Sequence, residues 1–205
     1  MKTIILATGN AHKAVEVRQI LEGLDVEVKT LKDIGLDPEI VEDGISFEEN
    51  ALIKARAVYA LTGCAVMADD SGIEIAAFEG GPGVYSSRFL GEDTDYNVKN
   101  AIILDRLKGA EGEERAADYR CVIALVLPPD KECGTAREIT EEGRVDGLIA
   151  REPAGEGGFG YDPIFEVPEY GCSMAELSAQ QKNAISHRGN ALKAVRPHIE
   201  KWLGE

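Results

Sequence analysis

The stretch TIILATGNAHK (residues 3–13) contains the basic unit of this chain: an apolar run, a short turn and the start of a helix. The run TIILA is rich in β-branched residues, which is typical of a buried strand. After the turn, apolar residues recur at helical spacing, at Ala14, Val17, Leu21 and Leu24. The segment therefore predicts a strand that leads directly into a helix.

Strands and helices continue to alternate along the rest of the chain. Further strands are expected at residues 26–31, 65–68, 119–127 and 137–150, the last one bent near Gly143. Further helices are expected at residues 46–63, 93–108 and 178–203. This alternation predicts an α/β fold, in a single domain that spans residues 1–205.

Local signals mark several of these elements. Two capping boxes, Ser46 with Glu49 and Ser178 with Gln181, are expected at helix starts. The longest apolar run, YRCVIALVL (119–127), is expected to be a central strand. Ser186 is placed to restart the last helix, so that the two residues after it point inward.

The composition excludes several classes of protein. The chain has 205 residues, 37 of them acidic and 22 basic, with a formal net charge of −15. So negative a chain would be repelled by a nucleic-acid polymer or an anionic membrane surface. No segment approaches the roughly 20 apolar residues needed to cross a bilayer. No two of the four cysteines form a C-x-x-C motif, and they lie at Cys64, Cys121, Cys133 and Cys172. This spacing predicts reduced thiols and a cytoplasmic location.

The stretch MADDSG (67–72) places two carboxylates, Asp69 and Asp70, at the expected exit of a buried strand. Like charges raise each other's pKa, and their burial costs desolvation free energy. Such a pair is either a solvated turn or a site that a cation approaches.

A glycine-rich segment, GEGGFG (155–160), matches the dinucleotide-binding pattern G-x-G-x-x-G. That interpretation is rejected, because Pro153 interrupts the preceding run and a strand, rather than a helix, is expected afterwards. Two interpretations remain. The segment is either a flexible loop, or a loop whose aromatic residues Phe159 and Tyr161 stack on a base.

Two further segments carry cations. ATGNAHK (7–13) lacks the end of a Walker A motif, but a helix start with free backbone N–H groups is suited to bind an anion. The alternative is a plain asparagine N-cap beside an exposed lysine. KNAISHR (182–188) groups Lys182, His187 and Arg188, and the alternative there is a solvated helix face.

Six motifs occur in order: TGNAHK, FEENALIKA, ADDSG, PGVYSSRF, GGFGYDPIF and ISHRGNAL. Together they closely resemble the inosine triphosphate pyrophosphatase family, which acts on non-canonical purine nucleoside triphosphates. The resemblance implies a two-lobed α/β protein with a long mixed β-sheet flanked by helices, and an active site in the cleft between the lobes. It also implies a homodimer and Mg²⁺-dependent hydrolysis of ITP, dITP and XTP to the monophosphate and pyrophosphate.

The resemblance also assigns roles to individual residues. Asp70 is implied as general base and metal ligand, and Glu42 as the second metal ligand. The implied phosphate-binding residues are Thr8, Gly9, Asn10, Ala11, His12, Lys13, Lys54 and Ser71. The implied base and sugar contacts are Phe159, Gly160, Tyr161, Asp162, Lys182, His187 and Arg188. Asp69 is expected only to assist.

Two alternatives stay open at this point. One is a sister pyrophosphatase family of the septum-inhibitor type, which acts on other nucleotides; the segments SHRGNAL and GGFGYDP argue against it. The other is a nucleotide-binding regulator that does not hydrolyse its ligand. Two intact carboxylates, Asp70 and Glu42, argue against a regulator, because pure binding needs no metal pair that activates water.

Overall fold

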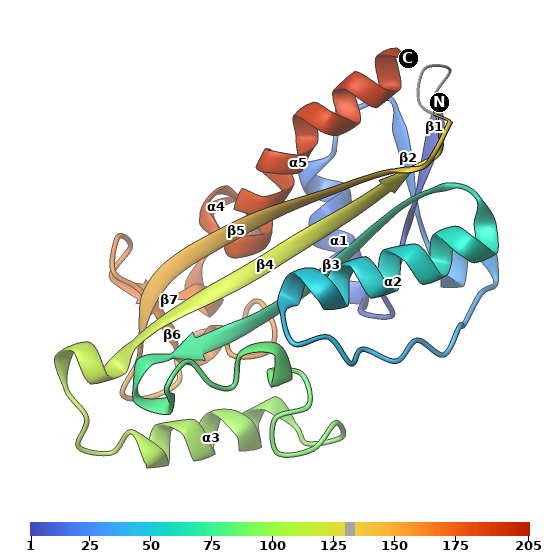
Figure 1. Cartoon of the computed structure of the whole chain (residues 1–205). Helices are drawn as coiled ribbons and strands as arrows, with labels where there is room; N and C mark the ends of the chain where they lie inside the picture. The colour runs from blue at the N-terminus through green and yellow to red at the C-terminus, as the bar shows by residue number, and fades with distance from the viewer. Residues whose placement is uncertain (130–133) are drawn as a thin grey trace. The chain divides into compact units, whose positions relative to one another are not determined.

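A computed structural model describes residues 1–129 and 134–205, and in this part of the chain it shows an α/β fold (Figure 1). One mixed sheet has the strand order β2-β1-β3-β4-β5-β6-β7. Its strands are β1 (Lys2–Leu6), β2 (Val26–Thr30), β3 (Ala65–Ile75), β4 (Ala116–Leu127), β5 (Arg137–Ile149), β6 (Phe165–Val167) and β7 (Cys172–Ser173). The α-helices are α1 (Ala11–Ile20), α2 (Phe47–Thr62), α3 (Tyr96–Arg106), α4 (Ala179–Ile185) and α5 (His187–Gly204).

The strand pairing explains why the sheet is mixed. β1 pairs in parallel with both β2 and β3, and Ile4 faces Val28 on one side and Ala65 on the other. The β5–β6 and β6–β7 pairs are antiparallel. β4 lies fourth among the seven strands, so the prediction of a central strand is confirmed.

The chain divides into two compact units, and β3, β4 and β5 contribute residues to both. Unit 1 comprises Met1–Asp70, Cys121–Gly143 and Arg188–Glu205, and unit 2 comprises Ser71–Arg120 and Arg144–His187. The expected bend of the long strand near Gly143 thus falls at a boundary between the units. The single two-lobed domain remains a prediction.

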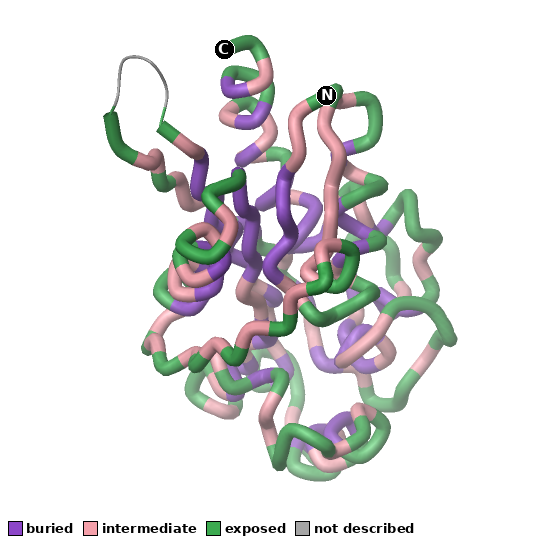
Figure 2. The backbone as a smooth tube through the Cα atoms, turned by 90° about the vertical axis from the view of Figure 1, so that its right-hand side faces the viewer, coloured by how far each residue is buried: buried purple, intermediate pink, exposed green. Residues whose placement is uncertain are grey.

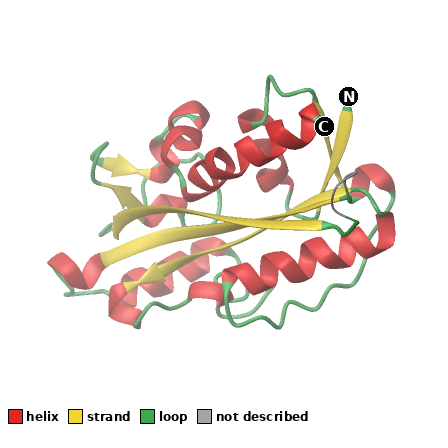
Figure 3. Ribbon diagram, turned by 45° about the horizontal axis from the view of Figure 1, so that its top comes forward, coloured by secondary structure: helices red, strands yellow, loops and turns green. Residues whose placement is uncertain are grey.

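The core of unit 1 is built around β1, β3 and β4. Apolar side chains of these strands pack against α1 and α5 on one face, with Val17, Leu192 and Val195 fully buried. Helix α2 lies on the other side of these strands, as both Figure 1 and Figure 3 show. The buried segments of this core are among those coloured purple in Figure 2.

Unit 2 has a separate core. Ile103 and Leu107, from α3 and its C-terminal end, pack there with Ile73, Tyr119 and Phe165 from the strands. Tyr161 also belongs to this core, and its ring makes an edge-on contact with Tyr96 at a centroid distance of 5.1 Å.

The structure corrects three local predictions. The strand expected at residues 65–68 continues to Ile75, because Ile73 and Ile75 alternate into the core and the two aspartates meet cations. The capping box at Ser46 is only half formed: the Ser46 hydroxyl accepts from the Glu49 N–H, but the Glu49 carboxylate accepts from the N–H of Ile45. A short 3₁₀ helix, not a strand, directly follows the glycine-rich loop, and β6 comes after it.

Other local predictions are confirmed. The capping box of Ser178 and Gln181 is complete. The last helical segment is split at Ser186, whose backbone is extended, into α4 and α5. The cysteines Cys64, Cys121 and Cys172 are free thiols, and Cys133 lies outside the described residues. Within the described ranges, no helix is long and apolar enough to cross a membrane.

Candidate active site

Asp69 and Asp70 lie in the middle of β3, and they do not share an environment. Successive side chains of a strand point to opposite faces of the sheet. Asp69 meets cations from α1 and α5, whereas Asp70 meets a cation from α2. The repulsion expected between two neighbouring carboxylates is therefore relieved on two faces by two different sets of partners.

The Asp69 carboxylate is itself 1% exposed and lies in a network of charged side chains. Its Oδ2 accepts from Lys13 Nζ at 3.0 Å and from Arg188 Nε and Nη2 at 3.1 and 2.9 Å. Arg188 Nη1 also donates to Glu16 Oε2 at 2.6 Å. Although burial acts to raise the pKa of Asp69, Lys13 and Arg188 outweigh it and hold this pKa below its ordinary value. Asp69 is therefore an ionised anchor for two cations.

The Asp70 carboxylate is part of a second cluster, together with Glu42 and Lys54. Lys54 Nζ contacts Glu42 Oε2 at 2.5 Å and Asp70 Oδ1 at 3.0 Å, and Asn50 Nδ2 approaches Asp70 Oδ2 at 3.4 Å. Burial raises the pKa of Asp70 against the opposing effect of Lys54. Burial acts to lower the pKa of Lys54, but Asp70, Asp69 and Glu42 raise it overall. A carboxylate with a raised pKa is a stronger proton acceptor, which suits a general base.

The loop that carries Glu42 is tied to the same helix. Asn50 Oδ1 accepts from the Gly44 N–H at 2.9 Å. A Cβ atom at Gly44 would lie 2.7 Å from this oxygen and 2.8 Å from the Cβ of Glu49, so the close approach requires glycine. Asn50 and Lys54 are one helical turn apart on α2, and together they contact both carboxylates and the loop.

These two carboxylates fit a magnesium ion chemically. Mg²⁺ prefers oxygen ligands and usually takes one or two carboxylates, with water and phosphate oxygens completing its shell. Glu42 and Asp70 provide two such groups around a single cation, the ammonium of Lys54. Across residues 1–129 and 134–205, no cluster of three or more His, Cys, Asp or Glu side chains forms a site from protein ligands alone.

The turn after β1 has the geometry of an asparagine N-cap. Asn10 Oδ1 accepts from the backbone N–H groups of His12 and Lys13 at 2.9 and 3.3 Å. The N–H of Asn10 donates in turn to Thr8 Oγ1 at 3.2 Å. Gly9, Ala11 and His12 are exposed beside it. The N-cap alternative is thus observed, and phosphate binding at this turn stays a prediction.

In unit 2 the glycine-rich loop is organised by Asp162. Its Oδ2 accepts from the N–H of Phe159 and from Lys182 Nζ, each at 2.8 Å. Lys182 Nζ also lies over the Phe159 ring, 4.7 Å from its centroid. A Cβ atom at Gly158 would lie 2.2 Å from the same carboxylate oxygen, so glycine is required there. Specific contacts therefore hold the loop, and Phe159 is partly exposed.

Tyr161 differs from the stacking interpretation. Its side chain is 3% exposed, and its hydroxyl donates to the Ser86 carbonyl at 2.6 Å. Burial raises its pKa. The ring is part of the unit 2 core, because it packs on Tyr96, and so it offers no open face to a base.

His187 and Arg188 are neighbours in sequence but belong to different units. The His187 ring stacks on Tyr119 at a centroid distance of 4.5 Å and an interplanar angle of 10°. Arg188 is 1% exposed and bound to Asp69 and Glu16. The alternative of a solvated helix face is therefore wrong for both residues, and their contacts with a base stay predictions.

Ser71 directly follows Asp70 in β3 and is half-buried.

Sequence reasoning missed three polar residues that support these clusters: Glu16, Asn50 and Asn100. Glu16 and Asn50 lie one helical turn from Lys13 and Lys54, so helical spacing was the available signal. Asn100 of α3 donates from Nδ2 to the Gly160 carbonyl at 3.1 Å, and its Oδ1 is buried without a hydrogen-bond partner in the described structure. Nothing local in the sequence indicates that contact, which joins residues 60 positions apart.

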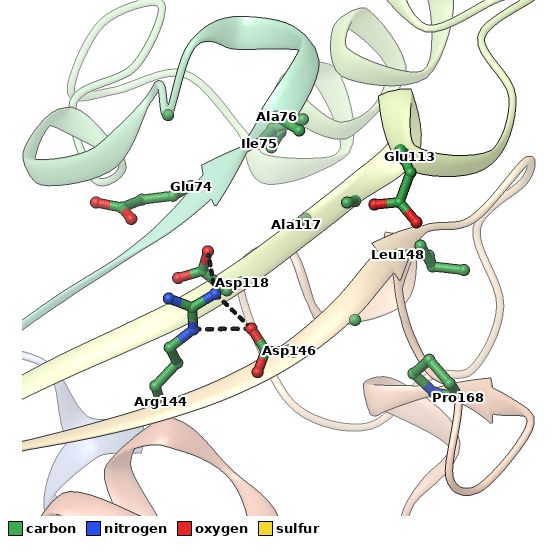
Figure 4. A pocket seen from close by; sticks show the side chains of 13 residues that line it. Glu74, Ile75, Ala76, Glu113, Ala117, Asp118, Arg144, Asp146, Leu148 and Pro168 are labelled. Atoms are coloured by element: carbon green, nitrogen blue, oxygen red, sulfur yellow. Dashed lines mark hydrogen bonds and ion pairs between the residues drawn. The ribbon is translucent and has the colours of Figure 1, made fainter.

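Unit 2 also contains a cavity of about 530 Å³ that none of the expected site residues lines (Figure 4). Charged side chains of β3, β4 and β5 surround it. Arg144 lies between Asp118 and Asp146, at 3.3 and 2.6 Å, as the dashed lines in Figure 4 indicate. Glu74 pairs with Arg120 at 2.9 Å. Two arginines are thus paired with three carboxylates on these strands.

The fold and the two clusters define a class: an α/β protein with a mixed sheet, in which two adjacent aspartates of a strand are paired with lysines of the helices. The sequence model of the Ham1 family matches residues 4–198. The chain therefore belongs to the Ham1 family.

Curated relatives agree over the full length. A dITP/XTP pyrophosphatase of Geobacter sulfurreducens is 44% identical over 204 residues, which cover 100% of this chain and 99% of the relative. A dITP/XTP pyrophosphatase of Bacillus subtilis is 46% identical and covers 98% of each chain. The resemblance inferred from the six motifs is confirmed.

Solved structures support the same fold. A HAM1 protein from Coxiella burnetii matches with a TM-score of 0.85 and 40% identity, over 98% of this chain and 100% of that one. The Staphylococcus aureus Ham1 protein matches with a TM-score of 0.83 and 36% identity, over 98% and 99%.

Proposed function

We propose that this protein hydrolyses non-canonical purine nucleoside triphosphates (ITP, dITP and XTP) to the monophosphate and pyrophosphate, with Mg²⁺ as cofactor. The observation that carries the proposal is the cluster of Glu42, Asp70 and Lys54, found in a chain whose full-length relatives are named dITP/XTP pyrophosphatases. Such an enzyme removes deaminated purines from the pool of nucleic-acid precursors.

The proposed chemistry assigns Asp70 as the general base that takes a proton from the attacking water. Its raised pKa favours this role, since the carboxylate holds a proton more strongly than an exposed aspartate. Glu42 and Asp70 are proposed to hold Mg²⁺. Bound there, the ion supplies a lowered pKa for its water and positive charge beside the phosphates.

The triphosphate is proposed to bind at Lys13, Lys54 and the turn at residues 8–12, with Ser71 assisting. At a net charge of −15, local cations are needed to attract an anionic substrate. Both lysines already lie beside carboxylates, which hold each ammonium in place.

The base and sugar are proposed to contact the Phe159 loop with Asp162, Lys182, His187 and Arg188. Phe159 is partly exposed and suited to stacking. Hypoxanthine and xanthine carry an acceptor oxygen where adenine carries an amino group. Hydrogen-bond donors at that position reject adenine strongly, because the mismatched polar groups stay unpaired.

The deciding experiment is a panel of triphosphates assayed for pyrophosphate release with Mg²⁺. We expect ITP, dITP and XTP to be hydrolysed far faster than ATP, GTP or pyrimidine triphosphates. Preference for another nucleotide would favour the septum-inhibitor sister family, and binding without release of product would favour a regulator. Replacing His187 or Arg188 is expected to reduce the preference for ITP more than the dependence on Mg²⁺.

Asp70→Asn tests the assignment of the base. We expect a loss of at least about 10²-fold in kcat, because the variant removes the proton acceptor. Asp146→Asn, an exposed aspartate of β5, is the matched control and should retain activity. An Asp70→Asn protein with most of its Mg²⁺-dependent activity would contradict the role of Asp70.

Two further proposals follow from the same family resemblance: a homodimer and a cytoplasmic location. The location is the compartment that contains the precursor pool on which the proposed reaction acts. Light scattering coupled to size exclusion tests the first proposal, because a homodimer has twice the 22.1 kDa mass of the chain.

A further inference from the structure

The ammonium of Lys54 has an unusual position for a residue expected to bind phosphate. It lies between Glu42 Oε2 at 2.5 Å and Asp70 Oδ1 at 3.0 Å, the two carboxylates suited to a divalent metal. Lys54 is 9% exposed, so its ammonium is buried, whereas the side chain of Glu42 is one third exposed. A buried ammonium close to two carboxylates provides the positive charge that a metal ion would otherwise provide.

We propose that Lys54 acts as a cation that competes with the metal, and that it moves from Glu42 and Asp70 to the substrate phosphates when metal and nucleotide bind. The proposal rests on the proposed function in one respect, the use of Glu42 and Asp70 as metal ligands. Asp70 Oδ1 and Glu42 Oε2 each accept from the ammonium, so a metal that uses these oxygens must displace it.

The surroundings of the cluster favour an exchange of partners over a rearrangement of the fold. Asn50 holds Asp70 through its Nδ2 and the Glu42 loop through its Oδ1, and neither contact involves Lys54. The Asp70 carboxylate and the backbone of the Glu42 loop therefore keep these contacts when the lysine leaves. A lysine side chain is long and flexible, with a compact point charge at its end, so it can change partners without moving α2.

The exchange has a thermodynamic consequence. Without nucleotide, the metal must displace a paired, buried ammonium, so its affinity for the free protein is reduced. A bound triphosphate offers Lys54 new anionic partners and removes this penalty. Metal and nucleotide therefore strengthen each other's binding, by the same factor in both directions. In the free enzyme the ammonium thus balances one of the two carboxylate charges and lowers the affinity for the metal.

The test is direct measurement of Mn²⁺ binding to the full chain without nucleotide, by calorimetry or by the EPR signal of free Mn²⁺. We expect Lys54→Met to bind Mn²⁺ about tenfold more tightly than the wild type. Lys201→Met removes the same charge from an exposed position of α5, and it should change the affinity by less than about threefold. With a non-hydrolysable ITP analogue present, the order should reverse, and Lys54→Met should bind Mn²⁺ more weakly than the wild type.

Equal or weaker binding of Mn²⁺ by a folded Lys54→Met protein would overturn the proposal. Lys54→Gln provides a second variant that keeps a polar side chain, and circular dichroism establishes that each variant is folded. In the wild type, saturating Mn²⁺ should increase the rate at which an acylating reagent modifies Lys54, and exposed Lys201 is the internal reference. An unchanged rate of Lys54 modification would also contradict the displacement of Lys54 by the metal.

The test separates this proposal from the proposed function. Mn²⁺ binding is measured without substrate, so its outcome does not depend on which nucleotide is cleaved. If pyrophosphate is released with Mg²⁺ but Lys54→Met gains no affinity for Mn²⁺, only the exchange is wrong. If Mn²⁺ affinity rises but no triphosphate is cleaved, only the function is wrong.

Discussion

Asp69 and Asp70 are adjacent residues with opposite pKa shifts. On one face of β3, Lys13 and Arg188 stabilise the charged form of Asp69. On the other face, burial raises the pKa of Asp70 despite the opposing effect of Lys54. Two neighbouring carboxylates thus become suited to different tasks: Asp69 to hold cations, and Asp70 to accept a proton.

Asp69→Asn should reveal the structural task of the first aspartate. The variant leaves Lys13 and Arg188 without their shared partner, so we expect a loss of about 3–5 kcal/mol in the free energy of unfolding at neutral pH. Because the pKa of Asp69 is lowered in the folded protein, its contribution is present above its ordinary pKa of 3.8 and is lost as the pH falls below it.

The difference in stability between wild type and Asp69→Asn should therefore shrink below about pH 4, and urea unfolding between pH 7 and pH 3 measures it. Asp146→Asn, an exposed aspartate, is the control and should change stability by no more than about 0.5 kcal/mol. A difference that stays constant over this range would show that the charge of Asp69 contributes nothing.

Lys13→Ala and Lys54→Ala test the phosphate end of the substrate. Both changes should raise KM for ITP and for ATP by similar factors, because both lysines would contact the triphosphate, which these substrates share. Steady-state kinetics with the two substrates measures this. A changed ratio of ITP to ATP activity would contradict the assignment of these lysines to the phosphates.

At the scale of secondary structure, α3 contacts the Phe159 loop at residues 160 and 161. Asn100 donates to the Gly160 carbonyl, and the Tyr96 ring packs on Tyr161. A hypothetical Cβ atom at Gly160 would lie 3.6 Å from the Tyr96 ring, an ordinary contact. The loop is thus held both by its own Asp162 and by a helix some 60 residues earlier.

Asn100→Ala should loosen the loop without touching the carboxylate cluster. The half-buried Gly160 carbonyl loses its donor, which costs about 1–3 kcal/mol in the free energy of unfolding. We expect KM to rise for all purine triphosphates while the Mg²⁺ dependence stays unchanged. Asn100→Asp keeps the shape but lacks the donor, and it should behave like Asn100→Ala. Asn97→Ala, exposed on the same helix, is the control; an equal effect there would contradict the role of Asn100.

Phe159→Ala tests the exposed face of the same loop. Activity on all purine triphosphates should fall together, because stacking tolerates any base. The triphosphate panel measures this loss. A selective loss for ITP would instead mean that Phe159 reads the base.

At the scale of the whole molecule, the net charge of −15 favours the binding of a small phosphate compound over a nucleic-acid polymer. A triphosphate can be held by a few local cations, whereas a polymer must contact a wide basic surface. We expect no change in the fluorescence anisotropy of a labelled DNA oligonucleotide at low salt with micromolar protein. Binding that weakens steeply with added salt would contradict this expectation.

The sequence by itself determined the α/β class, most element positions and the family, because these depend on local periodicity, capping residues and motif order. It also supplied the residues of the carboxylate–lysine cluster. Only the tertiary structure decided their partners. Arg188 meets Asp69 across 119 positions, and Tyr161 turns into the core of unit 2. No local pattern encodes such pairings, because a buried charge takes whichever counter-charge the packing of distant helices and strands brings within hydrogen-bond distance.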